Sequence, residues 1–199
     1  MKKALIAIVI VAVLGAAWFL GSPLLFDRTV DEGLDFLTDD GRVDMTAVMA
    51  VPEAERLDHM DDIMEAAASA PDSEMDEAMP ASEPRIVASG QFVDADSVHK
   101  GSGTANLYAL PDNSHVLRFE DFRTTNGPDL VVYLARHPSP ASASDVTDGG
   151  FLSLGDLKGN VGSQNYPIPA GTDLSEFNSV VIWCELFGVL FSPAALERT

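Results

Sequence analysis

Hydrophobic and polar positions follow three different patterns along the chain, and each predicts a different structure. Residues 4–26 are uncharged and mostly apolar. Residues 27–85 mix acidic clusters with short apolar groups. Residues 86–199 contain short runs of Val, Phe, Leu and Tyr, separated by Gly, Asn, Asp and Pro. We therefore predict three parts, of which only the last is a β-rich domain.

The uncharged N-terminal run is long enough to cross a membrane. Its 23 residues, Ala4 to Phe26, would form a helix of about 35 Å, and the hydrocarbon core is about 30 Å thick. Lys2 and Lys3 precede the run and Asp27 follows it, so the positive-inside rule keeps the lysines cytoplasmic. We expect a single-pass transmembrane helix or signal anchor over residues 1–26, with the lipid bilayer as a partner. A cleaved signal peptide is the alternative.

The middle part, residues 27–85, predicts an acidic, partly helical stalk. It holds 18 acidic residues and 4 arginines. Pro52 suits the first turn of a helix over about residues 53–68, with one apolar face. That face would pack on the following domain or on another copy, or would form a methionine-rich docking surface. Residues 69–85, rich in proline and acidic residues, predict a flexible linker. The apolar face consists of Leu57, Met60, Ile63, Met64 and Ala67.

The C-terminal part predicts an all-β domain. Turn-forming residues separate its apolar runs, and Asn126 to Asp129 is the clearest turn. Many short strands at such spacing favour an antiparallel β-sandwich or a jelly-roll-like fold for residues 86–199. The expected strands are Ile86–Val93, Gly103–Leu110, Ser114–Phe119, Leu130–Ala135, Phe151–Leu154, Asn165–Ile168, Ser179–Glu185 and Phe187–Phe191.

Charge and motifs exclude several classes of function. The net charge is −19, from 31 acidic and 12 basic residues. Nucleic acid is therefore not an expected partner, because phosphate binding needs clustered Lys and Arg. Phosphate-binding glycine motifs are missing from the sequence, as is the Gly-x-Ser-x-Gly motif of hydrolases. A conventional enzyme is not expected, although other chemistry stays open.

The chemistry that remains centres on one cysteine, Cys184. On an extended strand Val180, Ile182 and Cys184 share one face, so the thiol points into the core. Three interpretations stay open: an inert packed cysteine, a redox-active thiol or ligand of heme or another metal, and an intermolecular disulfide. Metal ligation would need companions, and the candidates are His99, His115, His137 and the methionines of residues 27–85. Their spacing fits neither structural zinc nor covalent heme.

An ordered series of motifs runs through the last part of the chain. It comprises Gly90-x-Phe92, Gly103-Thr104-Ala105, Val116 to Phe119 with Asp121-Phe122, Asn126-Gly127-Pro128-Asp129-Leu130, Leu154 to Tyr166, and Ser179 to Cys184. With this series, the residues from Gly90 onward resemble the DM-13 domain, an electron-transfer module. The resemblance does not extend to residues 1–85.

The resemblance implies a function and a central residue. DM-13 domains carry a characteristic cysteine, which Cys184 matches, and they occur beside cytochrome-like modules. It thus implies an electron-transfer or thiol-redox role with a separate redox protein as partner, outside the cytoplasm. The cofactor is unknown, and heme or another redox centre would fit that role. The alternative is a non-catalytic binding module at the cell surface, with Cys184 as a core residue.

Further candidate residues have structural and functional interpretations. Asn126, Gly127, Pro128 and Asp129 form a turn, or Asn126 and Asp129 line a polar site near Arg118 or Arg123. Two aromatic residues, Trp183 and Tyr166, are stacking platforms or part of an electron pathway, or they fill the core.

Overall fold

The computed structural model describes residues 38, 40–79 and 83–199, all within one unit, Phe36–Thr199. The membrane anchor expected at residues 1–26 lies outside the described residues. Within the described ranges, no helix combines the length and the apolar character needed to span a bilayer.

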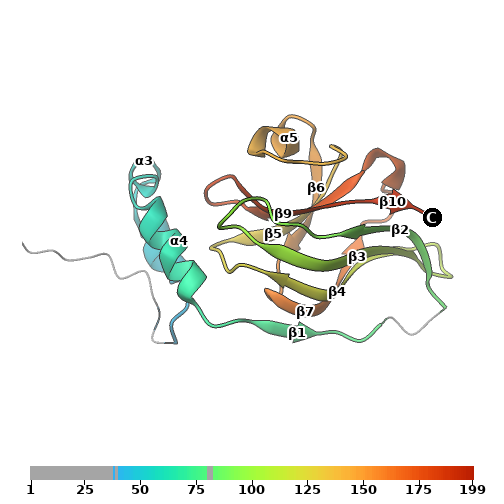
Figure 1. Cartoon of the computed structure of the whole chain (residues 1–199), viewed down its shortest axis with the longest axis horizontal. Helices are drawn as coiled ribbons and strands as arrows, with labels where there is room; N and C mark the ends of the chain where they lie inside the picture. The colour runs from blue at the N-terminus through green and yellow to red at the C-terminus, as the bar shows by residue number, and fades with distance from the viewer. Residues whose placement is uncertain (1–37, 39, 80–82) are drawn as a thin grey trace, which may run out of the picture. The chain divides into compact units, whose positions relative to one another are not determined.

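Ten strands of the described residues form two sheets that face each other (Figure 1). The six-stranded sheet has the order β1-β7-β4-β3-β2-β10, and the four-stranded sheet has the order β6-β5-β8-β9. The β1–β7 pair is parallel, and the other pairs are antiparallel. The fold is therefore β-sandwich-like, in agreement with the sequence pattern. The strands are β1 (Glu74–Asp76), β2 (Arg85–Gln91), β3 (Gly101–Ala109), β4 (His115–Thr124), β5 (Leu130–Ala135), β6 (Phe151–Asp156), β7 (Val161–Ile168), β8 (Ser179–Cys184), β9 (Val189–Ala195) and β10 (Glu197–Arg198).

The main core lies between the sheets. Alternate residues of β3, β4 and β7 face alternate residues of β5 and β8, because successive side chains of a strand point to opposite faces. Aromatic rings fill its centre: Phe92 contacts Phe119 and Phe122 edge to face, each with ring centroids 4.9 Å apart. Burial of these rings supplies much of the hydrophobic stabilisation.

The four-stranded sheet is buried on its outer face as well. A second cluster there includes Val131, Tyr133 and Trp183, and Val146 from helix α5 (Ala143–Thr147) belongs to it. Burial on both faces explains why β5 and β8 are almost continuously apolar instead of alternating. These two strands are the central pair of the four-stranded sheet.

The structure confirms each of the eight strands expected from the sequence, with ends that differ by a few residues. Three short elements are additional: β1, β10 and α5. A 3-10 turn at Leu174–Glu176 also precedes β8. None of these four carries a hydrophobic run, so periodicity could not have indicated them.

The helical region before the sheets comprises α2 (Met45–Ala50), α3 (Glu53–Arg56) and α4 (Met60–Ser69). A break between α3 and α4 interrupts the single helix expected there, and it leaves Leu57 67% exposed. Ile63 is fully buried with Val48, and this cluster packs against Leu186 and Phe187 in the β8–β9 turn. The helices are therefore packed against the β domain.

Part of the segment expected as a flexible linker is held against the six-stranded sheet. Strand β1 runs beside β7 (Figure 1), and a Cβ on Gly162 of β7 would lie 2.0 Å from the carbonyl oxygen of Met75. Only glycine permits this close approach. The acidic side chains also find partners: Asp72 pairs with Arg123 and Glu77 with Lys158. These contacts join residues that are distant in sequence. Composition does not show such contacts, and it therefore predicted a flexible linker.

Candidate functional site

Cys184 is the last residue of β8, at the end of the central strands. It lies opposite Leu130 on β5 and Val189 on β9. Its exposed fraction is 0%, and it belongs to the main core together with Ile182 and Phe191. This confirms the prediction that the thiol points into the core.

The thiol is engaged in a buried hydrogen bond. Cys184 Sγ donates to the main-chain oxygen of Pro128, 3.1 Å away. Burial raises the pKa of Cys184 to about 11; Asp129 raises it too, whereas the backbone N–H of Phe187 lowers it. The sulfur is therefore a protonated thiol at neutral pH, not the thiolate that acts as nucleophile or metal ligand.

The turn at residues 126–129 covers the thiol, and each of its residues has a separate structural role. Asn126 Nδ2 donates to the carbonyl oxygen of Ala70 at the end of α4, at 2.8 Å. A Cβ on Gly127 would lie 2.4 Å from the Phe191 ring. Pro128 accepts the bond from Cys184. The turn thus connects the helical region, the core and the cysteine.

Asp129 completes the turn in an unusual backbone conformation, with φ at 52°. Its carbonyl oxygen accepts a hydrogen bond from the Glu185 N–H at 3.0 Å, directly after Cys184. Burial raises the pKa of the Asp129 carboxyl, and the charges of Glu185 and Asp156 raise it further. The turn therefore carries a strained residue and a repulsive acidic neighbourhood beside the buried thiol.

The family model described as "Electron transfer DM13" matches residues 91–196. The chain belongs to the DM13 family. The match runs from the last residue of β2 through β9, with Cys184 and the turn inside it. No curated protein and no solved structure matches the chain.

The arginines of the DM13 domain that were candidates for a polar site have other partners. Arg118 bonds to Glu120 at 2.9 Å and to Asn165 at 3.0 Å. Arg123 lines a cleft with Asn126 but pairs with Asp72 at 2.8 Å. The turn is therefore not shown to form a polar site around an arginine.

The two candidate aromatic residues lie in different places. Trp183 points to the outer face of the four-stranded sheet, 6.3 Å from the Tyr133 ring. Tyr166 lies in the main core, and its hydroxyl donates to Gln164 at 2.7 Å. Burial raises the pKa of Tyr166, so its hydroxyl stays protonated. The structure does not gather these aromatic residues around Cys184.

The surroundings of Cys184 do not fit a heme. The sulfur has no exposed surface, and its hydrogen bond to Pro128 occupies one side. Among the residues that the structure describes, no three or more His, Cys, Asp or Glu side chains are grouped to hold a metal ion. A bound group at this sulfur would require movement of the turn.

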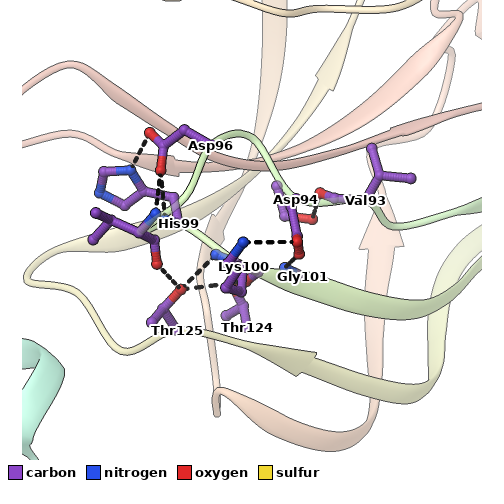
Figure 2. A network of polar contacts seen from close by, with 10 residues as sticks. Val93, Asp94, Asp96, His99, Lys100, Gly101, Thr124 and Thr125 are labelled. Carbon is purple, nitrogen blue, oxygen red and sulfur yellow. Dashed lines mark hydrogen bonds and ion pairs between the residues drawn. The ribbon is translucent and has the colours of Figure 1, made fainter.

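The histidines are placed separately. His115 begins β4, and His137 Nε2 lies 3.9 Å from an Asp145 carboxylate oxygen. His99 differs from both, because its Nδ1 lies 2.7 Å from Asp96 Oδ2 (Figure 2). Its ring also packs against the Phe191 ring, with centroids 4.3 Å apart. The ring therefore contacts a core residue that also packs on Gly127.

Sequence reasoning missed two polar pairs of the DM13 domain. In the first pair, Asp96 accepts hydrogen bonds from backbone N–H groups of its own loop, and these bonds fix the position of His99. In the second pair, the hydroxyl of Tyr133 donates to Glu185 at 2.5 Å. An Asp that precedes His by three residues in a loop is an Asx-turn signal and could have indicated the first pair. The second joins residues 52 positions apart, and local pattern cannot reveal it.

Proposed function

We propose that this protein is an electron-transfer protein, tethered to the cell membrane by residues 1–26, with its DM13 domain outside the cytoplasm. The observation that carries the proposal is the family match over residues 91–196. The charge pattern of the N-terminus supports the tether. The electron partner would be a separate redox protein.

Within this function we propose Cys184 as the redox residue. Its Sγ–H would give one electron to a heme-containing or metal-containing partner and its proton to solvent. The buried thiol is protected from unwanted alkylation and disulfide formation, and the strained, acidic turn of residues 126–129 is the element that would move to expose it.

A second candidate function is a non-catalytic binding module in which Cys184 only packs. The observation that favours it is the complete burial of the thiol together with its raised pKa. Such a cysteine behaves as a small hydrophobic residue. This candidate predicts that removal of the thiol changes stability but no redox property.

A spectroscopic redox titration of the full chain tests electron transfer itself. The protein is purified from membranes without heating or chelators and is titrated anaerobically with mediators, while electron uptake is counted. We expect uptake and release of a stoichiometric electron. A full chain that neither releases an electron on oxidation nor takes one up on re-reduction favours the binding module. Fractionation followed by protease treatment from the extracytoplasmic side tests the tether, because an anchored external domain is recovered with the membrane and is then digested.

A further inference from the structure

A cavity separates α4 from the loops of the β domain. Its volume is about 370 Å³. The spacing of the residues that α4 contributes places them on one face of the helix. From α4 come Asp61, Met64, Glu65 and Ala68, and from the loops come Val98, His99, Thr125 and Asn126.

His99 lines the cavity, and one of its ring nitrogens is buried without a hydrogen-bond partner among the described residues. This nitrogen is Nε2. The other ring nitrogen, Nδ1, lies 2.7 Å from Asp96 Oδ2. Because a carboxylate only accepts, Nδ1 donates, and Nε2 of the neutral ring is the acceptor.

The ring is fixed before any ligand arrives. The backbone N–H groups of Val98 and His99 both donate to Asp96 Oδ1 at 2.7 Å (Figure 2). The opposite side of the ring packs on Phe191, with centroids 4.3 Å apart. A carboxylate behind one nitrogen, which orients the other, is the arrangement that supports metal-bound histidines.

The lining of the cavity indicates the kind of ligand. Met64 offers a thioether, and the carboxylates of Asp61 and Glu65 flank it on the same helix face. The described residues that line this cavity include no Lys or Arg, so a cation is favoured over an anion. Ions that need several carboxylates or histidines do not fit, because the described residues contain no group of three or more such side chains. Imidazole with a thioether suits copper, and the thioether selects Cu(I), which tolerates few ligands.

We propose that this cavity is a copper site, with His99 Nε2 and the Met64 sulfur as ligands and with Asp61 and Glu65 supplying negative charge. The site joins the helical region to the β domain, so copper would stabilise the contact between α4 and the loop of residues 94–100. This proposal does not depend on the electron-transfer function or on Cys184.

The test measures Cu(I) affinity of the untagged full chain, anaerobically, in competition with a chromophoric Cu(I) chelator. We expect one Cu(I) per chain. The variants His99→Gln and Met64→Leu should each weaken binding by about tenfold or more, and Asp96→Asn by about 10- to 100-fold through loss of ring orientation. Matched controls, His115→Gln and the exposed Met49→Leu, should bind as the wild type does.

X-ray absorption of the loaded protein should show nitrogen and sulfur neighbours, and the sulfur should persist in Cys184→Ser but disappear in Met64→Leu. Circular dichroism checks that each variant is folded. If His99→Gln does not fold, the copper affinity of folded Asp96→Asn decides whether His99 is a ligand. The proposal is wrong if the chain does not hold copper against the chelator. It is also wrong if binding survives in folded His99→Gln and Asp96→Asn, or is lost in Cys184→Ser alone.

Discussion

The thiol of Cys184 donates its hydrogen bond to the main-chain oxygen of Pro128, at 3.1 Å. This bond links the only cysteine of the sequence to the turn that covers it. The turn also contacts α4 and Phe191. The burial of the thiol therefore depends on the turn, on the helix and on the packing of the Phe191 ring. The predictions below follow from these links.

The native thiol should react slowly with alkylating reagents. Its pKa is raised from 9.0 to about 11, so the thiolate fraction near pH 8 falls about 100-fold relative to an unperturbed cysteine. We expect carbamidomethylation of Cys184 in the folded chain to be slower by at least that factor than in guanidinium-unfolded chain, measured by mass spectrometry. Equal rates in the two states would show that the turn does not protect the sulfur.

Gly127→Ala should displace the turn. The added Cβ would lie 2.4 Å from one ring carbon of Phe191 and 2.6 Å from another, and overpacking of this kind costs about 1–3 kcal/mol. We expect a loss of that size in urea unfolding and faster alkylation of Cys184. Adding Phe191→Leu should recover part of the alkylation protection, because it removes the obstructing ring. If Gly127→Ala alone is as stable as the wild type, the close packing is not real.

Asn126→Ala should loosen α4. The substitution removes the hydrogen bond to the Ala70 carbonyl, and a bond of this kind contributes about 1 kcal/mol. Hydrogen exchange in residues 60–70 should accelerate. The matched control is Asn178→Ala, which removes an equivalent bond to the Arg136 carbonyl and should leave exchange in α4 unchanged. Identical exchange in the two variants would contradict the link between the turn and the helix.

Glu77→Gln should release β1 from β7 in a pH-dependent manner. The hydrogen bond from Lys158 holds the pKa of Glu77 below its usual 4.5, although desolvation opposes it. A lowered pKa means that the ionised carboxylate stabilises the fold above about pH 4.5 and that this contribution is lost as the pH falls. We expect faster hydrogen exchange in residues 72–79 of the variant near pH 7.

The difference between Glu77→Gln and the wild type should shrink as the pH falls below the usual pKa of glutamate. The control, Glu74→Gln, changes an exposed side chain on the same strand and should have little effect at any pH. A pH-independent difference for Glu77→Gln would mean that the ion pair does not hold the strand.

The elements with their own hydrophobic pattern could be predicted from the sequence. Strands β5 and β8 are almost continuously apolar, and the inward face of Cys184 followed from its neighbours Val180 and Ile182. Strand β1 could not be predicted, because its three residues, Glu-Met-Asp, carry no hydrophobic pattern. It is held by parallel pairing with residues 161–163 of β7, by the close approach at Gly162 and by an ion pair between residues distant in sequence. The sequence therefore indicated the sandwich but not what binds its edge.

The candidate site was predictable to a similar extent. The sequence identified Cys184 and the turn at residues 126–129, but not the bond between them, which joins residues 56 positions apart. It also named His99 and the methionines of residues 27–85 as possible ligands without a basis for pairing them. Only the position of α4 beside the loop of His99 places Met64 in the same cavity.

Protein-film voltammetry of the full chain tests the central claim, that Cys184 carries the electron, most directly. The variants to compare are Cys184→Ser and Ser179→Ala. Ser179 lies on the same strand as Cys184, and its substitution removes the side-chain bond to the main-chain oxygen of His137, at 2.7 Å, but keeps the thiol. We predict a redox wave in the wild type and in Ser179→Ala that is lost in folded Cys184→Ser. A wave that persists in Cys184→Ser, or none in the wild type, would contradict the claim and favour the binding module.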